Sequence, residues 1–539
     1  MTTITVSSGV TSRGLVVSSG GELDVLRGGN VVSTTVLNDG RETIKGGSAT
    51  FDVVSRGGVQ EIASSGVAEY ALLKGGDQFV DSAGFASGTV VGSGGELFVS
   101  TYGGLEGATV GSGGRLYAHG VEAGTIVLSG GVEYVYANHY NYGGGDTVSG
   151  GGQIFLYGQA NVETVAPGGR LNVLAQSNDD TVDSGGAEIV SSGGGFVFNA
   201  TLAGGKLDVY GVASATNVSG TSVEYVFAGG VTNSTIVSSG GNETVESGGV
   251  ASQTVVRASG QAFVLSGGLA SGTMVSSGGA EFVLSGAVGS GETVSGGGVE
   301  TISAGGEVRG LAVQAGGVLI DDGEVFLSGA TTLGNYPWAG ALSGSGLVVD
   351  ANGEDLVLSG SGAGFSGGAV IKGGTIELAT SGAIGAGYVQ FVAPATGSAV
   401  LQIDAADAPG AGGTFANEIF DFSGANEDID LRGVAFVAGA TATVSGGTLV
   451  LSDGGATYRF KLAGSIAGAY PVLSDGDGGT LIDPVPAAAH TSMSPKVLAF
   501  AHAAAAFAPL DASQTALVSS ASPTGQTAFP HATASAGGR

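Results

Sequence analysis

Aliphatic residues recur along most of the chain with a period of about 19 residues, and a glycine pair separates one period from the next. We take the second glycine of each pair, or the residue at its place, as a marker; about seventeen units then occupy the first 320 residues. The markers are Gly21, Gly40, Gly58, Gly76, Gly95, Gly114, Gly131, Gly152, Gly169, Gly186, Gly205, Ser222, Gly241, Gly260, Gly279, Gly298 and Gly317. Internal repeats of this length are typical of solenoid proteins, in which each repeat forms one coil.

Two rows of aliphatic residues keep a fixed distance from the markers. The row four residues after them is Val25, Ile44, Ile62, Val80, Val99, Ala118, Val135, Leu156, Val173, Val190, Val209, Val226, Val245, Val264, Val283 and Ile302. The row four residues before them includes Val17, Val36, Val54, Leu72, Val91, Val110 and Val127 and continues to Val313, with an interruption near Thr201. Because equivalent positions in stacked coils lie about 4.8 Å apart, both rows predict internal ladders of a parallel β-solenoid.

The residue types agree with this architecture. β-Branched side chains favour extended backbone, and a glycine pair permits the positive φ angles of a tight corner. Each unit is therefore predicted to be a strand–turn–strand–turn coil, and seventeen coils would stack to about 80 Å. A helical interpretation fails, because each glycine inside a helix costs about 1 kcal/mol.

The repeat pattern divides the chain into three parts. Residues 1–320 are predicted to form the regular solenoid, and residues 321–484 a less regular continuation that ends in a β cap. Residues 485–539 are rich in Ala, Ser, Thr and Pro and are predicted to be a disordered tail. The predicted fold class is all-β.

Composition and charge exclude several classes of protein. The chain has 106 glycines and no cysteine, so disulfides and thiolate metal sites are excluded. The net charge of −29 argues against nucleic-acid binding, because a phosphate backbone would be repelled. No uncharged apolar stretch is long enough to predict a transmembrane helix, and residues 1–10 do not have the pattern of a secretory signal.

One motif connects the repeats to a known family. The pattern Thr-x-Val-x-x-Gly-Gly-x-x-x-Val occurs at Thr89–Val99, Thr125–Val135, Thr235–Val245 and Thr273–Val283. It resembles the strand-loop-strand repeats of AIDA-type autotransporter passengers, and the segment Leu358–Leu378 looks like the passenger-associated repeats that often follow them. The resemblance implies a bacterial surface or secreted β-helix that mediates adhesion, autoaggregation and biofilm formation. The signal peptide and membrane barrel of that family are not visible in this sequence.

Parallel β-helices also include polysaccharide-degrading enzymes, which require clustered carboxylates in a cleft walled by long loops. The best carboxylate groups are Asp179–Asp180 with Asp183, and Asp321–Asp322 with Glu324; each is interpreted as a solvated turn. His119 and His139 are interpreted as single surface histidines. No catalytic residue is predicted.

Two acidic glycine-rich segments, residues 143–148 and 474–479, are similar to calcium-binding nonapeptide repeats. Such sites need the motif in tandem, so that adjacent turns share an ion, and neither segment is in tandem. No cofactor or metal site is predicted, and Ca²⁺ stays open as an alternative.

The third position after the marker carries aromatic residues in several units. They are Phe79, Phe98, Tyr117 and Tyr134 on successive units, and Phe263 and Phe282 on a later pair. If position four points inward, position three points outward, which predicts an exposed aromatic ladder. Such a ladder could bind sugar rings or a partner solenoid, or it could simply stabilise the coils by stacking on itself.

The second position often carries glutamate, and two pairs lie on neighbouring units, Glu224 with Glu243 and Glu281 with Glu300. We interpret them as part of a solvated acidic face. Acid would protonate these carboxylates and so relieve the repulsion between their like charges. Relief of this repulsion offers a route to pH-dependent self-association.

These observations predict a secreted or surface-exposed, non-enzymatic adhesin-like protein that acts through repeated surface contacts. Its expected partners are other copies of itself, or glycans and proteins of a cell surface. The alternatives are a polysaccharide-degrading enzyme and a self-assembling surface-layer or matrix component.

Overall fold

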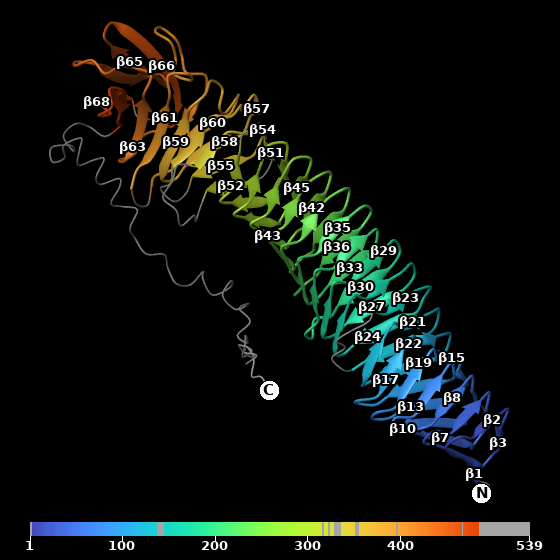
Figure 1. Ribbon diagram of the computed structural model, residues 1–539. Helices are drawn as coiled ribbons and strands as arrows, with labels where there is room; N and C mark the ends of the chain where they lie inside the picture. Colours follow the sequence, from blue (N-terminus) through green and yellow to red (C-terminus); the bar gives the residue numbers. More distant parts are fainter. Residues whose placement is uncertain are drawn as a thin grey trace, which may run out of the picture. The chain divides into compact units, whose positions relative to one another are not determined.

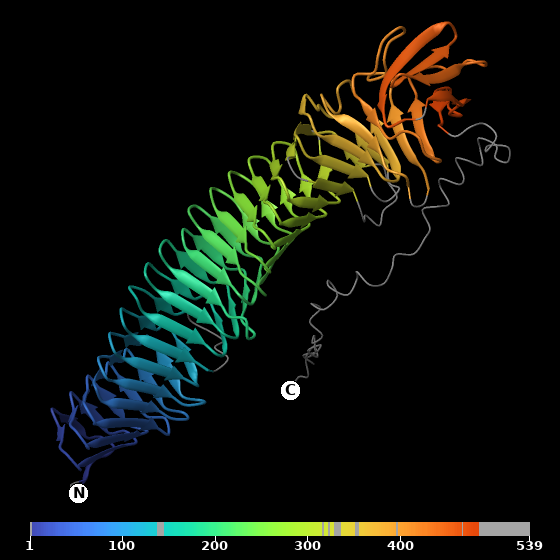
Figure 2. The same cartoon turned by 180° about the vertical axis from the view of Figure 1, so that it is seen from behind.

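The computed structural model describes residues 3–136, 145–314, 317–321, 324–327, 336–350, 355–394, 397–465 and 467–484 (Figures 1 and 2). The predicted tail, residues 485–539, lies outside the described residues. Every described element is a β-strand, and none of the described residues form a helix that could cross a membrane.

Each coil contains three strands. In a typical coil these are β36 (Val223–Val226), β37 (Val231–Asn233) and β38 (Ile236–Val237). The prediction of two strands per unit was wrong because the middle strand has only one inward side chain, Thr232 here, and that position is often a small residue. A single small residue leaves no aliphatic row in the sequence.

Equivalent strands of successive coils pair in parallel. β36 pairs with β33 (Lys206–Val209) before it and with β39 (Asn242–Val245) after it. The first strands of the coils form one sheet of 20 strands, from β1 (Thr3–Val6) to β57 (Gly364–Phe365), which we call sheet A. The third strands stack in the same way from β3 (Val16–Val17) to β50 (Ala312–Val313). The chain is therefore a parallel β-solenoid, as the repeats predict, and Figure 1 shows the coils stacked in sequence order.

The aliphatic rows form the core, with one correction: Leu73, and not the expected Leu72, stacks between Val54 and Val91. Val209, Val226 and Val245 stack in register in sheet A, and each is almost completely buried. The expected interruption near Thr201 is absent: Leu202 fills the row between Val182 and Val218. Leu202 lies three rather than four residues before its marker, so a search at fixed spacing misses it.

The two glycines of a pair have different functions at the corner. Gly240 has φ +87°, a conformation that costs an L-residue about 1–2 kcal/mol. A Cβ on Gly241 would lie 2.5 Å from the Val218 carbonyl oxygen in the coil below. The first glycine therefore allows the turn, and the second allows two coils to approach closely.

The parallel pairing continues into the C-terminal region. β56 (Asp355–Leu358), β59 (Gly374–Leu378), β61 (Ala399–Ile403) and β63 (Glu427–Leu431) stack in parallel. The chain then changes to antiparallel pairing in β64 (Thr441–Ser445), β65 (Thr448–Asp453) and β66 (Ala456–Ala463), drawn in orange in Figure 2. β69 (Thr480–Ile482) pairs antiparallel with β63. The open edge of the last parallel strand is thereby covered.

Candidate interaction surface and the polar interior beneath it

The aromatic residues at position three lie on the outer side of sheet A and stack ring on ring. The centroid distances are 4.9 Å from Phe79 to Phe98, 4.8 Å from Phe98 to Tyr117 and 5.1 Å from Tyr117 to Tyr134. The planes of these neighbours differ by 9° or less. All four side chains are half-buried, while positions two and four of the same strands are buried. The geometry of a continuous outward ladder is therefore present.

The ladder has a further member and a second row beside it, both of which the sequence analysis missed. Phe155 stacks on Tyr134 at 5.4 Å and extends the first row to five rings. Directly after three of these strands end, His119 stacks on Tyr136 at 4.4 Å and Tyr136 on Tyr157 at 5.0 Å. We call these eight residues the aromatic face: Phe79, Phe98, Tyr117, Tyr134, Phe155, His119, Tyr136 and Tyr157.

The rings of the aromatic face present their edges to solvent more than their faces. Because each ring is nearly parallel to its neighbours in the stack, its two faces are covered, except at the ends of a row. Tyr136 and Tyr157 are exposed, at 40% and 45%, and so is His119. Each stacked pair also contributes about 0.5–1.5 kcal/mol to the coils that carry it, so self-stabilisation and partner binding are both compatible with this geometry.

Phe263 and Phe282, the later pair, stack at 4.9 Å but form a ladder of only two. In the neighbouring coils position three is Thr244 on one side and Thr301 on the other. The pair is therefore separate from the aromatic face.

The glutamates at position two lie inside the solenoid, so their interpretation as a solvated face was wrong. Glu224, Glu243, Glu281 and Glu300 are each at most 1% exposed. On a strand, positions two and four point to the same side, and position four is in the core. The alternation that places the aromatic residues outside thus places these carboxyl groups inside.

Buried threonines at one corner provide hydrogen bonds to this interior layer. Thr235, which begins one copy of the repeat motif, donates from Oγ1 to Glu224 Oε2 at 3.1 Å, and Thr89 donates to Gln78 Oε1 at 2.9 Å. Thr232 of the middle strand donates to Glu243 Oε1 at 2.9 Å. The threonine of the motif is thus an inward-facing partner for position two.

Burial raises the pKa of the interior carboxyl groups. It raises the pKa of Glu224 to about 8, with the neighbouring Glu243 adding to the effect, and it raises the pKa of Glu300 to about 8, with Glu281 adding. Desolvation disfavours the charged form of a buried carboxyl group, and a like charge nearby disfavours it further. These side chains therefore favour the protonated form at neutral pH.

The first carboxylate group considered for catalysis is divided between outside and inside. Asp179 is exposed, with φ +58°, and accepts a hydrogen bond from Asn199 at 2.6 Å. Asp180 is buried, against the prediction of a solvated turn, and its Oδ1 accepts the Glu163 N–H at 3.1 Å. Burial raises the pKa of Asp180 to about 6.

The second group is only partly described. Asp321 is buried at position four, where other coils carry an aliphatic residue, so the solvated interpretation was wrong for it as well. Asp322 lies outside the described residues, as does His139, and no side-chain position is described for Glu324.

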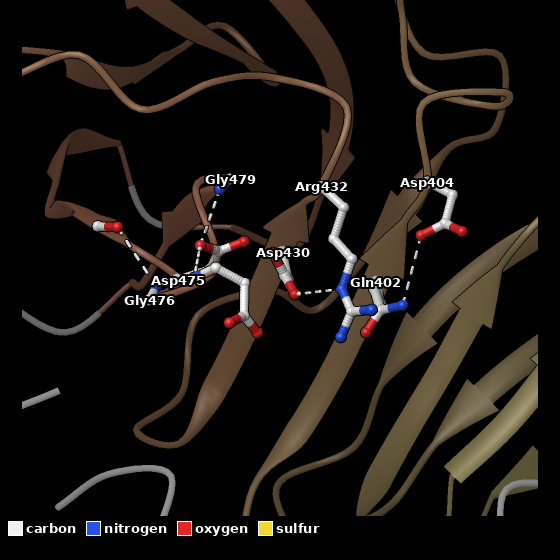
Figure 3. A network of polar contacts seen from close by, with 9 residues as sticks. Gln402, Asp404, Asp430, Arg432, Asp475, Gly476 and Gly479 are labelled. Atoms are coloured by element: carbon white, nitrogen blue, oxygen red, sulfur yellow. Dashed lines mark hydrogen bonds and ion pairs between the residues drawn. The ribbon is translucent and has the colours of Figure 1, made fainter. Parts of the chain in front are cut away.

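The acidic glycine-rich turn at residues 474–479 is closed by its own backbone (Figure 3). Asp475 Oδ1 accepts the N–H groups of Asp477 and Gly479, at 2.7 and 2.8 Å. Burial raises the pKa of Asp430 to about 6, and the negative charge of the nearby Asp475 adds to this increase. In the other segment, Gly143 and Gly144 lie outside the described residues, and the buried Asp146 accepts the Thr125 N–H at 2.8 Å.

These features define a structural repeat protein. Its coils are joined by short turns, and its aromatic face lies on the outside of one sheet. A comparison with protein families agrees with this class. Residues 221–279 match a family described as "Adhesin of bacterial autotransporter system, probable stalk". The match confirms, over this segment, the resemblance to AIDA-type passengers, and it supports an adhesin-like role.

Among solved structures, the chain is similar to a TibC-catalysed, hyper-glycosylated fragment of TibA. The alignment has 28% identity, covers 59% of this chain and 91% of that chain, and has a TM-score of 0.25. No match was found among curated protein sequences.

Proposed function

We propose that this protein is a stalk-like bacterial surface adhesin whose aromatic face mediates contact between copies of the chain, and so autoaggregation. The observation that carries the proposal is the aromatic face itself, two rows of stacked rings on the outside of the solenoid. Residues 221–279 of the same solenoid match an adhesin stalk family. Exposed aromatic clusters of this kind are typical of protein-interaction sites.

The geometry favours a protein partner over a sugar. Stacking on a sugar requires a free ring face, and the faces within the rows are covered by neighbouring rings. Ring edges and exposed Tyr hydroxyls can instead pack against an identical surface, because edge contacts between aromatic rings are favourable. Glycan binding at the ends of the rows is the second candidate.

Local charge also permits contact between copies. The chain has a net charge of −29, which opposes association in general. Beside the aromatic face, however, the first positions of the five strands are Asp77, Glu96, Arg115, Val132 and Gln153, and Arg115 pairs with Glu96 at 3.3 Å. With Asp81, which follows the first of these strands, the face carries three acidic groups and one basic group, a small part of the total negative charge. Salt that screens this charge should strengthen association.

The test compares two pairs of exposed, stacked aromatic residues on the full chain. Tyr136 and Tyr157 belong to the aromatic face; Phe51 and Tyr70 are an exposed pair on a corner, with centroids 5.3 Å apart. We expect Tyr136→Ser/Tyr157→Ser to reduce sedimentation of cells displaying the protein and to lower its light-scattering mass at high protein concentration. Phe51→Ser/Tyr70→Ser serves as the control and should change neither.

Equal behaviour of the two double variants and the wild type would contradict the proposal. Loss of cell adhesion to a glycan-coated surface without any change in self-association would favour the second candidate.

A further inference from the structure

Two groups of buried carboxylates in the described residues have the spacing of a metal site. One is Glu281, Glu292 and Glu300, which we call the glutamate triad; in it, one oxygen from each side chain lies within 4.8 Å of the others. Two oxygens bound to one ion at about 2.4 Å lie at most about 4.8 Å apart, so these three oxygens are close enough to share an ion. The other group is Glu122, Glu133 and Asp146.

The repeat explains how the triad is assembled. Glu281 and Glu300 occupy position two of β45 (Ala280–Val283) and β48 (Val299–Ile302) and stack directly on each other. Glu292 replaces the corner threonine in the turn before β47 (Thr293–Val294). A hydroxyl that could donate one hydrogen bond is thus replaced by a third acid, facing the other two.

The triad has more carboxylate oxygens than hydrogen-bond donors. Glu292 and Glu300 are completely buried and Glu281 is 1% exposed. None of their six oxygens accepts a hydrogen bond of ordinary geometry. The Thr273 hydroxyl is the one donor beside Glu281, and Glu292 and Glu300 interact with each other. The second group differs, because Asp146 already accepts the backbone N–H of Thr125.

A glycine leaves space for the corner acid. At Gly289, in the middle strand β46 (Val288–Ser290), a Cβ would lie 2.3 Å from Glu292 Oε1. In the two preceding coils this position is Ala251 and Ala270. The coil that carries Glu292 therefore has the smaller residue, glycine, at this position.

We infer that the glutamate triad binds one Ca²⁺ ion inside the solenoid. Buried anionic carboxylates require a compensating charge, and three of them can supply up to six oxygens. Ca²⁺ takes six to eight oxygen ligands in flexible geometry, whereas Mg²⁺ keeps several waters, for which a dry core has little space. The two charges of the cation would replace two of the three protons that otherwise neutralise the acids, and the third acid would keep its proton.

Because the site is closed by the coils above and below, the ion must enter as the chain folds. The full-length protein is therefore unfolded in urea with a chelator, refolded with Ca²⁺ or with EDTA, dialysed, and assayed for bound calcium. We expect Glu292→Gln to retain one equivalent fewer than the wild type. The control, Glu246→Gln, removes the same charge from a partly exposed side chain and should retain as much as the wild type.

Wild-type protein that retains no calcium, or equal retention by Glu292→Gln and the wild type, would overturn the inference. A second measurement does not depend on the variant folding. Infrared absorption of protonated carboxyl groups in the wild type should decrease in the Ca²⁺-refolded sample relative to the EDTA-refolded one. An unchanged band would mean that protons, and not an ion, neutralise the triad.

Discussion

The buried carboxyl layer predicts that the solenoid is more stable in acid than in alkali, and Glu224 offers the clearest test. Its pKa is raised from 4.5 to about 8, first by burial and then by Glu243. Below pH 4.5 the group is protonated in both the folded and the unfolded chain. Between the two values the folded chain holds a proton that the unfolded chain has lost, so stability decreases as the pH rises towards 8.

The magnitude follows from the same difference. A gap of about 3.5 pH units, at about 1.4 kcal/mol per unit, gives at most about 5 kcal/mol lost between acid and alkaline pH. Glu224→Gln keeps the shape and an acceptor for the Thr235 hydroxyl but does not titrate. We therefore expect it to match the wild type at pH 5 and to be more stable at pH 9 by up to that amount.

The assay is urea unfolding followed by circular dichroism at pH 5 and pH 9. Hydrogen exchange of the segment Val223–Val226 gives a local measure, because unfolding of a repeat protein need not be two-state. Glu246→Gln is the control, since it changes the net charge equally from a partly exposed position. The same loss of stability between the two pH values in Glu224→Gln and in the wild type would refute the reasoning.

Three further predictions concern the coils themselves. Val237→Ala removes two methyl groups from a closed row and should destabilise the chain by about 2 kcal/mol in urea unfolding; a cost below 0.5 kcal/mol would mean that neighbouring coils close the gap. In Gly229→Ala the new Cβ meets no atom within 4 Å, so the variant should cost only the strain of φ +81°, about 1–2 kcal/mol. In Gly230→Ala the new Cβ would lie 2.1 Å from the Val209 carbonyl oxygen, so this variant should be considerably less stable. Equal melting temperatures of the two variants would contradict the different functions of the two glycines. Phe98→Ala breaks two ring stacks and should cost about 1–3 kcal/mol, with reduced near-ultraviolet circular dichroism, and an unchanged spectrum would argue against an ordered ladder.

The sequence predicts those parts of the fold in which a large side chain occupies the same position of each repeat. The row from Val25 to Ile302 is visible because stacking requires the same residue type in each coil. The middle strands were missed because one small inward residue, such as Ala251, has no periodic signal of its own. Leu202 was missed because its coil is one residue shorter on that side.

The candidate site shows the same limit. Alternation along a strand was enough to place Phe98 and Tyr117 outside, and applied consistently it would also have placed Glu224 inside. What the sequence does not contain is the corner geometry that brings Thr235 to Glu224, or Glu292 between Glu281 and Glu300. Those contacts join residues 8 to 11 positions apart, and the segments from Glu224 to Thr235 and from Glu281 to Glu292 each contain a middle strand that the sequence did not predict.

The measurement that tests the central claim most directly is protease accessibility on intact bacteria that express the full chain. A surface adhesin should be cleaved by protease added outside the cells while a cytoplasmic marker stays intact. If the chain is protected until the cells are lysed, the adhesin assignment is contradicted and only the β-solenoid remains.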